Sequence, residues 1–223
     1  MTTNSGTARR RGLQAWAALG GVAYVVLYLI GIILIFDGEP DNGAPPAKLI
    51  EFFGDSGHRG RMGLGWVLAG LGLFFFLFFV ASLRQTVSRF DRDGMLAALT
   101  AIGGGVYAAL ALTAIGLELG VRTMSDDTYQ HQVYPEIIHA AGDAGYVIHA
   151  SGGVGMGMMI LAAGIAFIRS GVVPKWAGWL SVVAALAALA TIMFFTTFIW
   201  WLWIIVAGIV MFWKGTGADA AAV

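Results

Sequence analysis

Five polar side chains follow one another at helical spacing inside a long apolar stretch of the chain: Glu136, His139, Asp143, Tyr146 and His149. Successive residues of an α-helix are rotated by about 100°, so Asp143 and Tyr146 lie within about 40° of His139 around the helix axis. Carboxylate and imidazole groups on one side of a helix can bind a polar ligand, transfer protons or hold a metal ion. We therefore take this side of the predicted helix 135–169 as the candidate site.

The depth of these groups in a membrane follows from the length of the helix. Arg169 is expected at the inner interface, and about 20 residues that rise about 1.5 Å each reach His149 after about 30 Å, the thickness of the hydrocarbon layer. Asp143 and His139 then lie about 9 and 15 Å further out. Glu118, near the outer end of the preceding predicted span, reaches the same level. The site is therefore expected to open toward the extracytoplasmic face.

Two sets of residues are candidates for binding. The ligand-binding candidates are Glu118, His139, Asp143, Tyr146 and His149, whereas the metal-binding candidates are Glu136, His139 and Asp143. The spacing of Glu136 and His139 resembles the Glu-x-x-His ligation of metals in helical bundles, although two such motifs are expected there and only one is present. Structural hydrogen bonds and salt bridges at the helix end are the competing explanation for the same residues.

The chemistry of the chain leaves three functional hypotheses open. The first is a non-enzymatic membrane protein that binds a lipid-like ligand or a partner subunit through the polar patch. The second is a metal-assisted or acid-base enzyme that acts on an amphiphilic substrate, with His139 and Asp143 as ligands or proton carriers. The third is a proton-coupled carrier that uses Asp143 and His149 as a relay. Serine-nucleophile, P-loop, dinucleotide-binding and HExxH motifs are missing, so the sequence assigns no catalytic residue and requires no cofactor.

The composition indicates a lipid environment. Hydrophobic residues make up 58% of the 223 residues and charged residues only 12%, which is typical of an all-α, polytopic membrane bundle. The net charge is zero and the longest basic run is Arg9–Arg11, so a nucleic-acid partner is not supported. The absence of cysteine excludes disulfides, iron-sulfur clusters and thiol catalysis.

Six apolar segments are predicted to span the membrane. Their approximate bounds are 14–36, 62–83, 95–117, 146–168, 176–194 and 198–213, with a turn between the last two near 195–198. They form one domain over residues 13–214, flanked by cytoplasmic tails at 1–12 and 215–223. The outer loop 37–61 is expected to hold a short helix that lies in the interface, and the glycine triplet Gly103–Gly105 predicts a close helix crossing or a kink.

The orientation follows from the basic residues. An inside N-terminus places nine Lys and Arg residues on the cytoplasmic side and four outside, as the positive-inside rule requires; the four are Lys48, Arg59, Arg61 and Arg122. Both termini are then cytoplasmic, and the protein is expected in the cell (inner) membrane. Tryptophans are predicted at the inner level (Trp16, Trp176, Trp179, Trp213) and the outer level (Trp66, Trp200, Trp201, Trp203).

The N-terminal half has a recognisable layout. A basic first span is followed by PPAKLIEFFGDSGHRGRMGLGWVLAGLGLFFFLFFVASLR and by a glycine-rich third span. Over roughly residues 13–117 this resembles a group of bacterial six-span integral membrane proteins whose domain has no known activity. The resemblance implies a bacterial inner-membrane protein and implies no activity.

Overall fold

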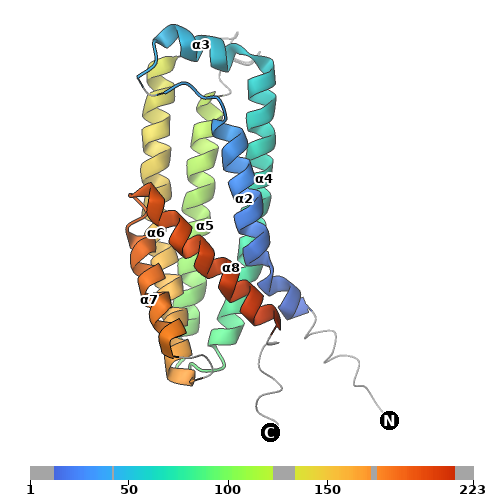
Figure 1. Ribbon diagram of the computed structural model, residues 1–223, viewed down its shortest axis with the longest axis vertical. Helices are drawn as coiled ribbons and strands as arrows, with labels where there is room; N and C mark the ends of the chain where they lie inside the picture. Colours follow the sequence, from blue (N-terminus) through green and yellow to red (C-terminus); the bar gives the residue numbers. More distant parts are fainter. Residues whose placement is uncertain (1–12, 42, 123–133, 172–174, 214–223) are drawn as a thin grey trace, which may run out of the picture.

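The computed structural model describes residues 13–41, 43–122, 134–171 and 175–213, and every regular element in these ranges is helical (Figure 1). The predicted all-α fold is therefore confirmed for this part of the chain. The predicted tails 1–12 and 215–223 lie outside the described residues.

Five helices of the described ranges are long and apolar enough to cross a membrane, which makes the chain a multi-pass membrane protein. The first runs from Leu13 to Phe36 and contains α2 (Gly20–Phe36). The others are α4 (Ser56–Val87), α5 (Met95–Arg122), α6 (Pro135–Ser170) and a segment from Phe194 to Trp213 that contains α8 (Thr197–Trp213). These helices cover five of the six predicted spans, all except 176–194, and α4 and α6 begin several residues before the spans predicted for them.

The α7 helix (Lys175–Leu189) is shorter than the predicted fifth span. Its 15 residues extend about 22 Å, less than the roughly 30 Å of a hydrocarbon layer. After Leu189 the chain turns through a short 3₁₀ helix, Phe194–Thr196, so the turn begins slightly earlier than expected. From this turn α8 runs back at a slant, away from the end of α7 and toward the start of the first long helix (Figure 1). The Thr196 hydroxyl donates to the Ala190 carbonyl at 2.9 Å, which favours a turn over a continued helix. The described residues thus hold five helices of spanning length, and a sixth crossing stays a prediction.

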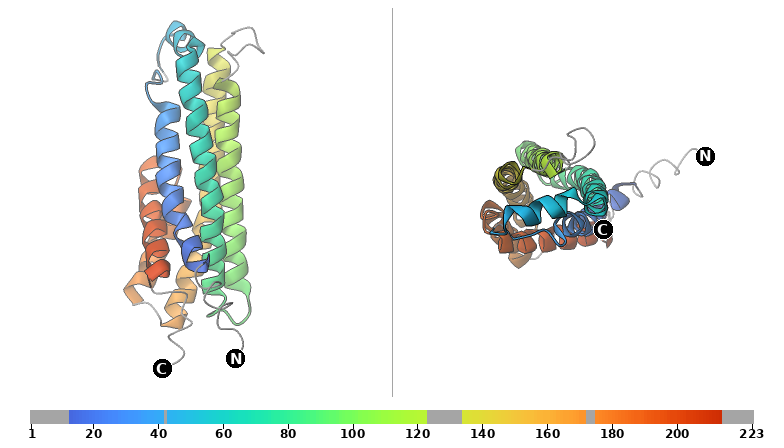
Figure 2. Two further views of the ribbon diagram at one scale, coloured as in Figure 1. Left: turned by 90° about the vertical axis from the view of Figure 1, so that its right-hand side faces the viewer. Right: turned by 90° about the horizontal axis from the view of Figure 1, so that it is seen from above.

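Glycines set the distance between the long helices. A Cβ at Gly103 of α5 would meet the backbone of Gly155 and Met159 on α6, and a Cβ at Gly155 would meet the backbone of Gly103. Gly31 of α2 and Gly65 of α4 form a second crossing of the same kind. The close crossing predicted from the glycine triplet is therefore confirmed, and it holds α5 and α6 side by side along most of their length (Figure 2).

The α3 helix (Pro46–Gly54) lies across one end of the bundle (Figures 1 and 2). Its buried face consists of Leu49, Phe52 and Phe53, which form a small apolar cluster with Met62 and Ile138. This confirms the short helix predicted in the loop 37–61. It also brings the loop after α2 close to the upper ends of α5 and α6, where the candidate residues lie.

Two of the tryptophans predicted at the outer level, Trp200 and Trp201, face the core of the bundle. Their side chains are 0% and 6% exposed, because α8 packs against α2 and turns both indole rings into the core. Trp201 donates from Nε1 to the Tyr24 hydroxyl at 3.3 Å. By contrast, Trp16, Trp176, Trp179 and Trp213 of the predicted inner belt are all strongly exposed.

Candidate functional site

An ion cluster centred on Arg122 connects three parts of the fold. Arg122, at the end of α5, donates from Nη1 to Glu118 at 3.1 Å and from Nη2 to both carboxylate oxygens of Glu39 at 3.0 and 3.2 Å. The guanidinium carbon also lies 5.1 Å from the centre of the Phe36 ring. Arg122 is only 4% exposed, and a charge this deeply buried persists only when opposite charges pair with it. The cluster therefore fastens the loop after α2 to α5.

The position of Glu118 depends on a glycine of α6. A Cβ at Gly145 would clash with the Glu118 carboxylate, whereas a Cβ at Gly142 would come no closer than 4.0 Å to Arg122. Only Gly145 therefore lets the carboxylate lie between α5 and α6 and reach Arg122. The glycine at position 145 of α6 thus leaves space for the Glu118 side chain of α5.

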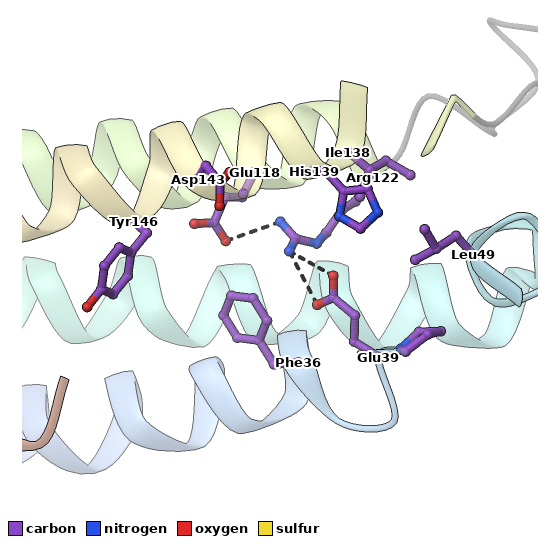
Figure 3. Close-up of a pocket in the computed structure, with 11 residues that line it drawn as sticks. Phe36, Glu39, Leu49, Glu118, Arg122, Ile138, His139, Asp143 and Tyr146 are labelled. Carbon is purple, nitrogen blue, oxygen red and sulfur yellow. Dashed lines mark hydrogen bonds and ion pairs between the residues drawn. The ribbon is translucent and has the colours of Figure 1, made fainter. Parts of the chain in front are cut away.

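Four of the five predicted ligand-binding residues line one cavity of about 460 Å³ (Figure 3). They are Glu118, His139, Asp143 and Tyr146, and the wall is completed by the Arg122 cluster with Phe36, Pro40, Leu49, Ile138 and Gly142. Three carboxylates, one guanidinium and one imidazole surround this space, which we call the polar cavity. Whether these residues bind a ligand stays a prediction, but the structure does bring them to one place.

The predicted metal set is not assembled. Glu136 is exposed in the first turn of α6 and does not line the polar cavity, unlike His139 and Asp143. Within the described ranges, no three His, Asp or Glu side chains come close enough together to share a metal ion. Helical spacing places Glu136, His139 and Asp143 on one side of α6, but it does not bring their side chains together.

A second cavity of about 530 Å³ adjoins the polar one. The two share Phe36, Glu118 and Tyr146 in their walls. Most of the second wall is apolar, with Leu29, Ile32 and Ile33 of α2 on one side and Phe194, Phe198 and Trp201 of the α7–α8 hairpin on another. We call this space the apolar cavity. It reaches His149, the fifth predicted ligand-binding residue, which lies deeper along α6 than the other four.

His149 belongs to a buried group of aromatic side chains. Its Nδ1 lies 3.3 Å from the Tyr28 hydroxyl, and its ring stacks on the Tyr28 ring at 6.1 Å between centroids. Further into the core, the hydroxyls of Tyr24 and Tyr107 are hydrogen-bonded to each other. These contacts satisfy polar groups that would otherwise be unpaired in an apolar environment. They account for His149 structurally, and they separate it from Asp143, since the structure gives no hydrogen bond between the two.

The α7–α8 turn forms one wall of the apolar cavity. The Tyr146 hydroxyl donates to the Ile192 carbonyl, and Gly153 of α6 gives room for Ala188 and Thr191. Phe194 and Phe198 line the cavity and are 61% and 51% exposed. The wall is thus held to α6 by Tyr146, a residue that faces both cavities.

Sequence reasoning missed several residues of the site, namely Tyr24, Tyr28, Phe36, Glu39, Arg122 and Trp201. Two of them carried a local signal, because Arg122 follows Glu118, and Tyr28 follows Tyr24, by one helical turn. Glu39 carried none, because its partner Arg122 lies 83 residues away in the chain.

The helices and the two cavities define an all-helical, multi-pass membrane protein with a mixed polar and apolar site toward one end of the bundle. No protein-family model, no curated protein and no solved structure matches the chain. The resemblance over residues 13–117 therefore stays a prediction, and the function has to be argued from the site.

Proposed function

We propose that this membrane protein binds an amphiphile, with the polar head in the polar cavity and the apolar body in the apolar cavity. The observation that carries the proposal is that a charged cavity and an apolar cavity share Phe36, Glu118 and Tyr146. Both volumes fall within the range of about 300–1,000 Å³ that is usual for small-molecule sites. Neither a purely polar ligand nor a plain hydrocarbon would match both spaces.

The depth of the two cavities supports the same function. Ile192, Met193, Phe194 and Phe195 at the α7–α8 turn are all more than half exposed, as suits residues in contact with hydrocarbon. This turn lies partway along α6 (Figure 1), and Tyr146 contacts it about 34 Å from the Arg169 end of the helix. We therefore place the hydrocarbon boundary near Tyr146. The apolar cavity then lies at the depth of acyl chains and the polar cavity at the depth of head groups.

We further infer the orientation of the chain from its basic residues. With the N-terminus in the cytoplasm, nine of the 13 Lys and Arg residues lie on the cytoplasmic side, and the polar cavity opens to the extracytoplasmic face of the inner membrane. The α7–α8 hairpin would return the C-terminus to the cytoplasm and complete six passages. The contact between Trp16 and Phe212, with ring centroids 5.7 Å apart, supports this because it brings the start and the end of the bundle together.

The test is to fill the apolar cavity and measure bound amphiphile. Ala114 of α5 is 2% exposed and lines that cavity, so Ala114→Phe should occupy part of it. Ala109 is exposed on the same helix and lines neither cavity, so Ala109→Phe is the matched control. Ile33→Trp, at an exposed position of the cavity wall, repeats the test without altering the core.

Native mass spectrometry of the full chain released from micelles gives the measurement. We expect an adduct with the mass of an amphiphile on the wild type and on Ala109→Phe, and we expect it to be strongly reduced on Ala114→Phe and Ile33→Trp. Equal adducts on all four proteins, or none on the wild type, would overturn the proposal. An adduct with the mass of a second polypeptide would overturn it in favour of a partner subunit.

A further inference from the structure

The charges around the polar cavity are strongly unequal. Three carboxylates, those of Glu39, Glu118 and Asp143, line it against the single guanidinium of Arg122. Among the described residues of the wall, His139 is the only other group that can carry a positive charge. With a neutral imidazole and all three carboxylates ionised, the described part of the wall carries two negative charges in excess. A phosphate, sulfate or carboxylate in this space would face like charges at short range.

Arg122 is poorly placed to compensate for an anion, because its side chain is only 4% exposed and faces two carboxylates. Nη1 donates to Glu118 and Nη2 donates to Glu39. Nε has no hydrogen-bond partner among the described residues, but it is buried and does not face open space. An anionic head would have to displace one of the two carboxylates, and the displaced carboxylate would then lose its own partner in a largely buried place. Anion binding at this arginine is therefore disfavoured.

Asp143 is the carboxylate left for a ligand. It lines the polar cavity, it is exposed, and it forms no ion pair with any described residue. The aromatic side chains of Phe36 and Tyr146 line both the polar and the apolar cavity. Ring faces and carboxylates both attract ammonium groups. The free groups of the wall are thus chiefly acceptors, and they suit a cationic head that carries an apolar body.

From this complementarity we propose that the ligand is a cationic amphiphile, with an ammonium head beside Asp143 and an apolar chain in the apolar cavity. The proposal rests on the amphiphile-binding function and adds the charge of the head. Because like-charge rejection and opposite-charge attraction act together, the preference for an ammonium over a sulfate of the same chain length should reach about tenfold or more. The preference should decline as added salt screens the exposed carboxylate.

The probes are two single-chain amphiphiles that carry a bromine at the chain end, an alkyl trimethylammonium and an alkyl sulfate of equal length. Bromine quenches tryptophan fluorescence at short range, and Trp201 lines the apolar cavity. The full chain is placed in nanodiscs of phosphatidylcholine, and Trp201→Phe identifies the part of the quenching that comes from this cavity. We expect the ammonium probe to reach half of its Trp201-dependent quenching at about a tenth of the concentration that the sulfate probe needs.

Two variants connect the preference to the polar cavity. Asp143→Asn should weaken ammonium binding about fivefold and leave sulfate binding equal or stronger. Glu136→Gln removes an acidic charge from the same helix outside the cavity wall, so it should leave both affinities unchanged.

The outcomes separate the two proposals. Sulfate that quenches Trp201 as well as the ammonium does, or an unchanged preference in Asp143→Asn, would overturn the cationic head and leave amphiphile binding standing. If neither probe gives Trp201-dependent quenching, both proposals are overturned.

Discussion

The carboxylate of Glu118 on α5 occupies the space that a side chain at position 145 of α6 would need, so Gly145 is what lets Glu118 reach Arg122. A buried ion pair and a helix crossing thus depend on the same glycine. This relationship links the packing of the bundle to the wall of the polar cavity, and it can be tested directly.

Gly145→Ala should destabilise the protein. The added Cβ would clash with Glu118 and force α5 and α6 apart or break its contact with Arg122, which should lower the free energy of unfolding by about 1–3 kcal/mol. Gly142→Ala, three residues away on the same helix, meets only Arg122 at 4.0 Å and should be neutral or stabilising. Thermal unfolding of both variants in one detergent provides the comparison. Equal melting temperatures for the two variants would contradict the role of Gly145.

Arg122→Gln should be more harmful still. It leaves two poorly exposed carboxylates, those of Glu39 and Glu118, without an opposite charge, and breaking a buried pair costs about 3–5 kcal/mol. Arg61→Gln is the control, because the Arg61–Asp37 pair at 2.8 Å is largely exposed and is expected to contribute less than about 1 kcal/mol. Chemical denaturation of both variants measures the difference, and a loss at position 61 as large as at position 122 would refute the prediction.

The glycine triplet offers a test within three consecutive residues. Gly103→Ala places a methyl group against the backbone of Gly155 and Met159, whereas nothing lies within 4 Å of a Cβ at Gly105. We expect Gly103→Ala to lower stability by about 1–3 kcal/mol. Gly105→Ala should leave it unchanged or raise it by up to about 1 kcal/mol, because alanine favours the helix. Similar losses at both positions would mean that the triplet does not act through this crossing.

The residue that caps the N-terminus of α4, Asp55, should make the stability of the protein depend on pH in the acidic range. Asp55 accepts a hydrogen bond from the backbone N–H of His58, and this bond lowers the pKa of Asp55 below its ordinary value of 3.8. A carboxylate with a lowered pKa stabilises the fold above the ordinary value, and this stabilisation is lost as pH falls through the lowered pKa. Asp55→Asn keeps a cap acceptor without the charge. Thermal unfolding of the wild type and of Asp55→Asn is measured from about pH 7 to about pH 3. The difference in stability between the two proteins should become smaller as the pH falls. If the stability difference between the two proteins stays constant with pH, the ionised carboxylate of Asp55 does not stabilise the start of α4.

Much of the fold followed from the order of apolar and polar residues. Continuous apolar runs of spanning length predicted the long helices, because unpaired backbone groups are costly in lipid and a helix pairs them within the segment. The outer loop 37–61 was predicted to hold a short helix, and the glycine triplet predicted a close crossing or a kink. These signals are local, so they can be detected without knowing which helices are neighbours.

The tertiary structure decided which helices meet and therefore what the polar residues do. The sequence placed Glu118, His139, Asp143 and Tyr146 toward the outer end of the bundle, but only packing joined them to Glu39 and Arg122 and left an apolar cavity below them. Packing also buried Trp200 and Trp201 and brought Tyr28 of α2 against His149. The physical reason is that depth and helix face are set by spacing along one segment, whereas pairing and cavities depend on contacts between segments, such as Glu39 with Arg122, that local spacing does not encode.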